Sequence, residues 1–225
     1  MSEWHEFVDT ARLDRALAQH LADRLAADIA ARGEASLAVS GGATPTGMFR
    51  QLSACDIDWE RVWLTLVDER RVATDNPDSN ERLLRENLLQ NRAARARFVS
   101  MEKTAAHGLE SLEKAIEAMP QPFSAVVLGM GGDGHTASWF PGAANLAALL
   151  DPQNMAGVAA TEPLTAPHRR LTLTLAGVLR SREIIIHIAG ETKKSVLENA
   201  ESQDYPVAAI LRQNKTPASI WWAPG

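Results

Sequence analysis

The stretch Ser36-Leu-Ala-Val-Ser-Gly-Gly-Ala-Thr-Pro45 decides the fold, because it carries a strand, a turn and a helix start in one line. The apolar run 36–40 is short and continuous, which is typical of a strand buried on both faces. Gly41-Gly42 interrupts that run, and Pro45 suits the first turn of a helix. Helical spacing then relates Met48, Phe49 and Leu52. The stretch therefore predicts one strand-to-helix unit of an α/β protein.

The same alternation continues on both sides of this stretch. Upstream, apolar residues recur every four positions from Leu13 to Ile29, and Gly33 ends the predicted helix. Downstream, the predicted strands are 62–67, 124–128, 157–161, 170–175, 184–188 and an edge strand at 219–222. The predicted helices are one carrying Leu83–Leu88 and capped by Ser79 or Asn80, one over about 104–119 and one over 193–200. This order predicts a mostly parallel sheet with helices on both faces, formed by residues 1–225 as a single domain.

The composition limits the kinds of partner. The chain has 225 residues and a net charge of −5 with no long basic run, which argues against nucleic acid. No run approaches the roughly 20 apolar residues that a membrane span needs, and the first residues lack the pattern of a secretory signal. Cys55 is the single cysteine, so no internal disulfide can form. We expect a cytoplasmic protein without a membrane partner, as a monomer or small homo-oligomer.

Four unusual polar segments each follow a predicted strand directly. They are Ser40–Pro45, Asp68–Arg70, Gly129–His135 and Gly190–Lys193. Because parallel strands all point the same way, their carboxyl ends lie along one edge of the sheet, where open α/β sheets bind ligands. We therefore expect these segments, distant in sequence, to gather around one pocket.

The segment 40–45 has the features of an anion site. Two glycines let an anion approach the main chain at a helix N-terminus, and Thr44 adds a hydroxyl. The alternative is a plain turn between a strand and a helix. Cations for a phosphate monoester would come from Arg169 or Arg170 and from Lys193 or Lys194, each of which is otherwise an ordinary surface charge.

The segment Gly129-Met-Gly-Gly-Asp-Gly-His135 is interpreted as a platform for a proton-transfer group. Its G-x-G-x-x-G spacing also occurs in dinucleotide sites, but Phe140-Pro-Gly142 ends the run before a long helix can form. His135 is suited to take a proton near neutral pH, and Asp133 would orient the loop or hold charge nearby. The alternative is a structural histidine bonded to a carbonyl.

Other kinds of chemistry find no support in the sequence. No serine lies in a G-x-S-x-G elbow, and the histidines show no metal-ligand spacing. His187 lies inside an apolar strand, which indicates a packed core residue. We therefore expect neither a metal nor a cofactor.

The polar motifs, together with Ser79-Asn80 and Arg170-Leu-Thr-Leu173, resemble in order those of the 6-phosphogluconolactonase family over about residues 36–200. The resemblance implies a three-layer Rossmann-like α/β fold and hydrolysis of 6-phospho-D-glucono-1,5-lactone in the oxidative pentose phosphate pathway. It implies His135 as general base and Arg70 as an active-site arginine. The phosphate site that the resemblance implies consists of Ser40, Gly41, Gly42, Ala43, Thr44, Arg170 and Lys193.

Two alternatives remain. Glucosamine-6-phosphate deaminase shares the scaffold, but its sequence pattern has Asp-Glu-Tyr where this chain has Asp68-Glu-Arg70. It also has Phe-Asn-Glu-Pro in place of Ser138–Pro141, and the missing glutamate serves sugar ring opening in that enzyme. The other alternative is a sugar-phosphate-binding domain without catalysis. The local differences favour the lactonase.

Overall fold

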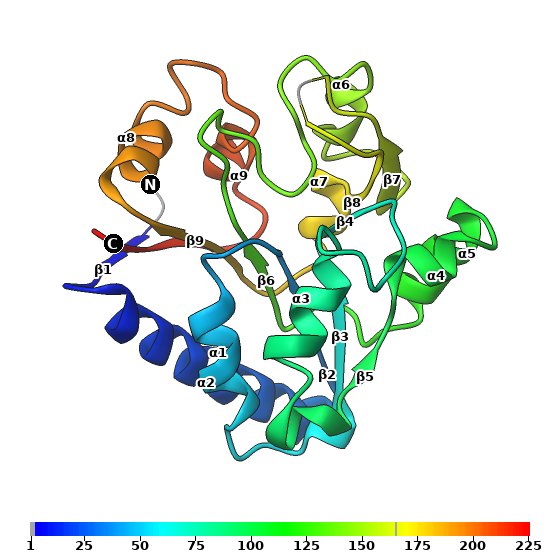
Figure 1. Cartoon of the computed structure of the whole chain (residues 1–225), viewed down its shortest axis with the longest axis vertical. Helices are drawn as coiled ribbons and strands as arrows, with labels where there is room; N and C mark the ends of the chain where they lie inside the picture. Colours follow the sequence, from blue (N-terminus) through cyan, green and yellow to red (C-terminus); the bar gives the residue numbers. More distant parts are fainter. Residues whose placement is uncertain (1–2, 165) are drawn as a thin grey trace.

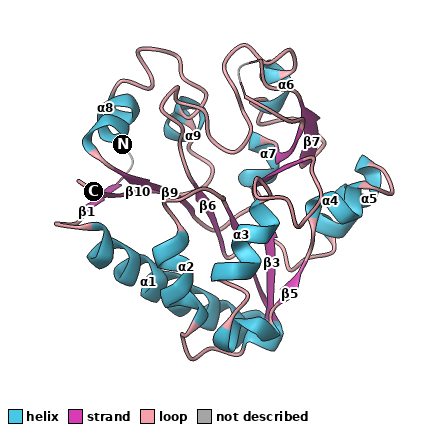
Figure 2. Cartoon of the chain, in the orientation of Figure 1, coloured by secondary structure: helices cyan, strands magenta, loops and turns pink. Residues whose placement is uncertain are grey.

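A seven-stranded parallel sheet forms the centre of the computed structural model, which describes residues 3–164 and 166–225 (Figures 1 and 2). Neighbouring strands all pair in parallel. In spatial order the strands are β1 (Glu3–Glu6), β10 (Ala218–Ala223), β9 (Ile184–Ala189), β6 (Ala125–Leu128), β2 (Ala35–Val39), β3 (Val62–Leu66) and β5 (Arg97–Phe98).

Helices cover both faces of this sheet, which confirms the predicted α/β architecture. Figure 1 shows α1 and α2 on one side and α8 and α9 on the other. The helices are α1 (Thr10–Arg32), α2 (Thr46–Ser53), α3 (Asn80–Asn87), α4 (Met101–Ala105), α5 (Leu109–Glu117), α6 (Leu146–Leu149), α7 (Leu175–Val178), α8 (Glu191–Glu198) and α9 (Ala208–Arg212). Short 3₁₀ turns lie at Trp59–Arg61 and Asn91–Arg95. Among the described residues, no helix is both long and apolar enough to cross a bilayer.

The predicted central strands and the first helix form because their apolar residues match the sheet. Every residue of β2 is buried, as expected for a parallel strand covered on both faces. On α1, the leucines at the predicted spacing are fully buried against the sheet. Asp9 caps the helix by accepting a hydrogen bond from the Arg12 N–H (2.7 Å), and Gly33 ends it with a φ of 87°.

A second, three-stranded antiparallel sheet lies beside the first, and the sequence did not predict it. It consists of β4 (Asp68–Arg70), β8 (Arg170–Leu173) and β7 (Val158–Thr161), in the order β4-β8-β7. Segment 68–70 is therefore a strand of this sheet rather than a loop after β3. The two sheets are joined at Val67, whose N–H donates to Val39 of β2 and whose carbonyl accepts from Leu173 of β8.

Two further expectations were wrong. The helix predicted over 104–119 is divided into α4 and α5, because Gly108 between them has a φ of 105° that a helix does not accept. The strand near the C-terminus is not at the edge of the sheet, since β10 lies between β9 and β1. The sequence of β1, Glu-Trp-His-Glu, lacks the apolar run that marked the other strands.

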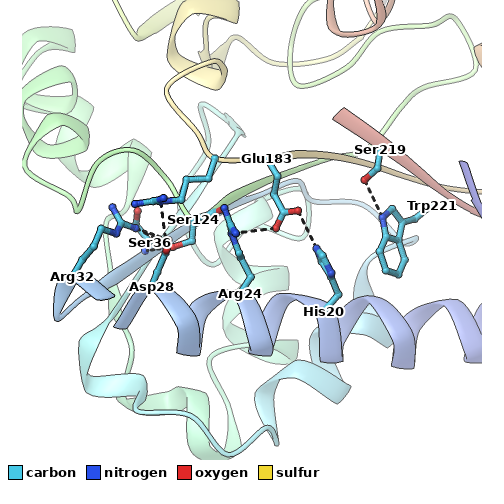
Figure 3. A network of polar contacts seen from close by, with 10 residues as sticks. His20, Arg24, Asp28, Arg32, Ser36, Ser124, Glu183, Ser219 and Trp221 are labelled. Carbon is cyan, nitrogen blue, oxygen red and sulfur yellow. Dashed lines mark hydrogen bonds and ion pairs between the residues drawn. The ribbon is translucent and has the colours of Figure 1, made fainter. Parts of the chain in front are cut away.

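Polar side chains of α1 form a network at the amino ends of the strands (Figure 3). His20 Nε2 lies 3.0 Å from Glu183 Oε2, directly before β9, and Arg24 Nε lies 3.7 Å from Glu183 Oε1. Further along the helix, Arg32 pairs with Asp28 at 2.6 Å. This network ties α1 to the sheet at the edge opposite to the polar loops.

The His20–Glu183 contact makes part of the stability depend on pH. The hydrogen bond to Glu183 raises the pKa of His20, although burial opposes it. Because the pKa of His20 is higher in the folded chain than its unfolded value of about 6.5, the protonated ring stabilises the fold fully at pH values below about 6.5. This contribution is lost as the pH rises through the folded-state pKa. We expect Glu183→Gln to cost more at about pH 5.5 than at about pH 8.5, by on the order of 1 kcal/mol in urea unfolding. The Arg24 pair is lost at both pH values, so equal costs would contradict the role of His20.

Candidate active site

The four polar segments meet at a cavity of about 180 Å³. The segments line it together with residues from α3 and the loop after β6. The lining residues are Ser40, Gly41, Gly42, Ala43, Thr44, Pro45, Asp68, Arg70, Asn80, Gly129, Met130, Gly131, His135, Ala137 and Lys193. The structure thus brings together segments that are up to 150 residues apart, as the parallel topology requires.

The loop 40–45 lies at the end of β2 and leads into α2. Gly42 has a φ of 92°, a conformation that favours glycine. Gly41 also has no room for a side chain, because a Cβ there would lie 2.0 Å from Asn80 Oδ1. The loop therefore packs its backbone directly on α3 and presents main-chain groups and Thr44 to the cavity at the N-terminus of α2.

His135 is held by Asp133 within the glycine loop that follows β6. Asp133 Oδ1 lies 2.5 Å from His135 Nδ1 and 3.2 Å from the His135 backbone nitrogen. Because a carboxylate only accepts, Nδ1 carries the proton, and in the neutral imidazole the lone pair is then on Nε2. The Phe140 ring stacks on the imidazole with centroids 4.3 Å apart. A Cβ at Gly131 would lie 2.2 Å from the imidazole, so the loop can hold the ring this way only with glycine there.

Lys193 lines the same cavity from the first turn of α8. Burial lowers the pKa of this lysine. Its neighbour Lys194 instead bonds Glu6 (Nζ–Oε1, 2.8 Å) and lies 4.0 Å from the centroid of the Trp222 ring. Of the two lysines that the sequence left open, Lys193 is therefore the one at the cavity.

An adjoining cavity of about 280 Å³ holds the arginines. Both cavities share Asp68, Arg70 and His135. The second is lined by Asp68, Arg70, Asp78, His135, Phe140, Ala166, Pro167, His168 and Arg170. Arg170 is the arginine at the site, whereas Arg169 is exposed and pairs with Glu162 at 3.4 Å.

Arg170 is a buried cation that its neighbours leave partly unbonded. It is only 4% exposed, and its Nε and Nη1 atoms have no hydrogen-bond partner in the described parts of the chain. It lies opposite Arg70 in the β4–β8 register. Burial, and then the charge of Arg70, lowers the pKa of Arg170. The structure therefore places Arg170 beside Arg70, and not in the cavity that Lys193 shares with the loop 40–45.

Asp68 and Glu69, whose roles the sequence left open, differ in their surroundings. The Asp68 carboxylate accepts from Ser138 Oγ at 2.6 Å and borders both cavities. Glu69 is 1% exposed and accepts four hydrogen bonds, three from Ser79, Asn80 and Glu81 at the start of α3 and one from the Arg70 N–H in β4. Glu69 therefore supports the fold around the site, while Asp68 faces the cavities.

The sequence missed Asp78 and His168, which pair across the second cavity at 2.9 Å (Oδ2–Nε2). Neither lies in a glycine-rich motif, and the only signal was their nearness to Arg70 and Arg170 along the chain. His187 is buried, as predicted, and burial lowers its pKa to about 4. Residues 3–164 and 166–225 contain no group of three or more histidine, cysteine or acidic side chains placed to hold a metal.

Comparison with known proteins gives consistent matches along the whole chain. The family described as glucosamine-6-phosphate isomerases/6-phosphogluconolactonase matches residues 8–222. A 6-phosphogluconolactonase from Rhizobium meliloti (strain 1021) is 45% identical over 231 aligned positions, covering 98% of each chain. The crystal structure of a 6-phosphogluconolactonase from Shewanella baltica OS155 superposes with a TM-score of 0.94 at 44% identity. That match covers 99% of this chain and 98% of the other.

Proposed function

The chain belongs to the family of glucosamine-6-phosphate isomerases and 6-phosphogluconolactonases, and from that membership we propose that it hydrolyses 6-phospho-D-glucono-1,5-lactone to 6-phosphogluconate. The chain is an enzyme, a hydrolase that opens a lactone ester. One observation carries the assignment of the site. His135, held by Asp133, lies between a cavity with a phosphate loop and Lys193 and a cavity with two arginines.

The 6-phosphate binds at the end formed by the loop 40–44 and Lys193. Backbone N–H groups at the start of α2 suit a phosphate, and the ammonium of Lys193 supplies charge. The sequence assigned Arg170 to the same phosphate. Its place beside Arg70 in the adjoining cavity supports a role at the lactone end instead.

The reaction then needs one base and one stabilised oxyanion. Nε2 of His135 accepts a proton from water as the water oxygen bonds to C1 of the lactone. The carbonyl oxygen becomes an oxyanion, which the guanidinium of Arg70 stabilises. When the bond between C1 and the ring oxygen breaks, the imidazolium returns its proton to that oxygen. Asp133 keeps the imidazole in the required tautomer throughout and is a positioning residue.

The site differs from that of a deaminase at two positions next to the base. Phe140 stacks on the His135 ring, where the deaminase pattern has a glutamate for ring opening. Arg70 stands where that pattern has a tyrosine. The cation can stabilise an oxyanion, and the apolar Phe140 ring provides no carboxyl group for ring opening of an amino sugar. The reaction is a step of the oxidative pentose phosphate pathway. We propose that the enzyme acts in the cytoplasm and that its active form is a monomer or a small homo-oligomer.

The test of this function is acid release from freshly prepared 6-phosphogluconolactone, followed with a pH indicator and corrected for spontaneous ring opening. We expect rapid acid release and no ammonia from glucosamine 6-phosphate measured in parallel. Ammonia release without lactone hydrolysis would identify a deaminase. Binding of the sugar phosphate without turnover would identify a ligand-binding domain.

Lys193→Met provides a matched variant for the phosphate end in the same assay. Loss of a charge-assisted contact should raise KM for the phosphorylated lactone by about 10- to 100-fold and change kcat less. Unphosphorylated gluconolactone should be hydrolysed as by the unaltered chain. Lys194→Met is the control, because that neighbouring lysine bonds Glu6 outside the cavity. Equal losses on both lactones would remove the phosphate role of Lys193.

A further inference from the structure

The pair His168–Asp78 lines the outer part of the cavity that Arg70 and Arg170 also line. His168 lies two residues before β8, and Asp78 lies in the turn before α3. His168 has a φ of 70°, which is unusual for a residue other than glycine and marks a backbone held by its surroundings. The hydrogen bond uses Nε2 of His168, so Nδ1 is its remaining polar atom. Arg70 Nη1 donates to the carbonyl of the same Asp78.

The carboxylates around this cavity are already engaged by protein groups. Asp78 is bonded to His168, Asp68 accepts from Ser138, and Glu69 accepts four hydrogen bonds from β4 and the start of α3. The guanidinium groups of the two arginines are not all paired with protein acceptors in this way. Arg70 and Arg170 face each other across the two strands, and two nitrogens of the buried Arg170 find no partner among the described residues. A buried guanidinium with free N–H groups beside a second one is suited to an external oxyanion.

We propose that His168, oriented by Asp78, is a third cationic donor of this cavity and binds an oxyanion of the sugar ligand together with Arg70 and Arg170. The proposal rests on the proposed function, since ring opening at C1 produces a carboxylate that the lactone lacks. Lys193 and the loop 40–44 lie at the other end of the cleft. The cleft then binds the phosphate at one end of the product and the carboxylate at the other. The hydrogen bond from His168 lowers the pKa of the Asp78 carboxyl, so an ionised carboxylate lies beside the His168 ring.

The charged groups that face His168 come from three other elements. They are Asp78 from the turn before α3, Arg70 and Asp68 from β4, and His135 from the loop after β6, while Arg170 follows on its own segment. A neutral hydrogen-bonding side chain at position 168 would keep the bridge to Asp78 but supply no charge to the ligand. Such a variant therefore distinguishes a role of His168 in ligand binding from a role in the structure alone.

The test measures binding without turnover, by titration calorimetry with 6-phosphogluconate. We expect His168→Gln, which can still donate to Asp78, to weaken binding by about 5- to 20-fold. His168→Lys retains a positive charge and should restore most of the affinity. His107→Gln is the matched control, because His107 is exposed and outside both cavities. In the lactonase assay, His168→Gln should raise KM more than it lowers kcat.

Two shorter ligands identify the anionic group that His168 meets. Gluconate carries only the carboxylate, and glucitol 6-phosphate carries only the phosphate. We expect His168→Gln to weaken gluconate and leave glucitol 6-phosphate unaffected; the reverse would place the phosphate in the arginine cavity and still support His168 as an anion donor. Unchanged binding of all three ligands, or failure of His168→Lys to restore affinity, would overturn the proposal. Failure of the lactonase function would appear separately, as absent acid release with these affinities intact.

Discussion

Replacing His135 by Ala should lower kcat for 6-phosphogluconolactone by about 10²- to 10⁴-fold, the usual contribution of a positioned general base. The imidazole borders both cavities, and its Nε2 has no partner among residues 3–164 and 166–225 because Asp133 bonds Nδ1 instead. Without it, water must attack C1 unassisted and the ring oxygen must leave without a proton donor. The anion-binding groups at both ends remain, so KM should change far less than kcat. Single-turnover acid release is the measurement.

The control is His20→Ala, which removes an imidazole from the network on α1 at the opposite edge of the sheet. Its kcat should stay close to that of the unaltered chain. Calorimetry with 6-phosphogluconate shows whether His135→Ala still folds and binds. An unchanged kcat in a variant that binds the product would remove His135 from the mechanism and leave Asp68, which borders both cavities, as the candidate base.

Much of the central sheet could be predicted because its strands have a recognisable sequence pattern. β2, β6 and β9 are buried on both faces, and that environment demands a continuous apolar run. Parallel topology then fixes which edge the following loops share. The meeting of Gly41, His135 and Lys193 at one cavity follows from these two facts, without any pairwise signal between the segments.

Two strands of the second sheet, β7 and β8, were predicted as strands, but their pairing with β4 in a separate sheet was not. β4 has three charged residues, and its partner β8 lies about 100 residues later in the chain. The pairing places Arg170 opposite Arg70, a neighbour that the sequence alone did not indicate. His168 and Asp78 meet for the same reason, since they lie at the ends of segments that only the second sheet brings together.

Glu69→Gln should be the most destabilising conservative change near the site. Oε1 accepts from the backbone N–H groups of Arg70 (2.7 Å) and Asn80 (2.8 Å), and Oε2 accepts from Ser79 Oγ (3.0 Å) and the Glu81 N–H (2.7 Å). A glutamine turns one of these oxygens into a donor, so two buried donors lose their acceptor in either orientation. At about 1–3 kcal/mol for each of the two buried unsatisfied groups, the free energy of unfolding should fall by about 2–6 kcal/mol.

The charged form of Glu69 also matters for α3. Burial raises the pKa of this carboxyl, while its four hydrogen bonds oppose the rise. A proton on either oxygen would face a donor, so we infer that the carboxylate is ionised and acts as the anionic cap of the α3 N-terminus. Its loss loosens Asn80, which packs against Gly41 of the phosphate loop and donates to the Asp68 carbonyl at 2.9 Å. Stability and KM should therefore change together.

The measurement is thermal unfolding, with Glu86→Gln as the matched control. Glu86 lies on the same helix and makes an exposed pair with Arg82, which contributes under about 1 kcal/mol. For a chain of this size, Glu69→Gln should lower Tm by roughly 5–15 °C, against at most about 3 °C for Glu86→Gln. Equal shifts would show that the four hydrogen bonds of Glu69 do not hold α3. A large fall in kcat with an unchanged Tm would instead make Glu69 a group that acts on the substrate.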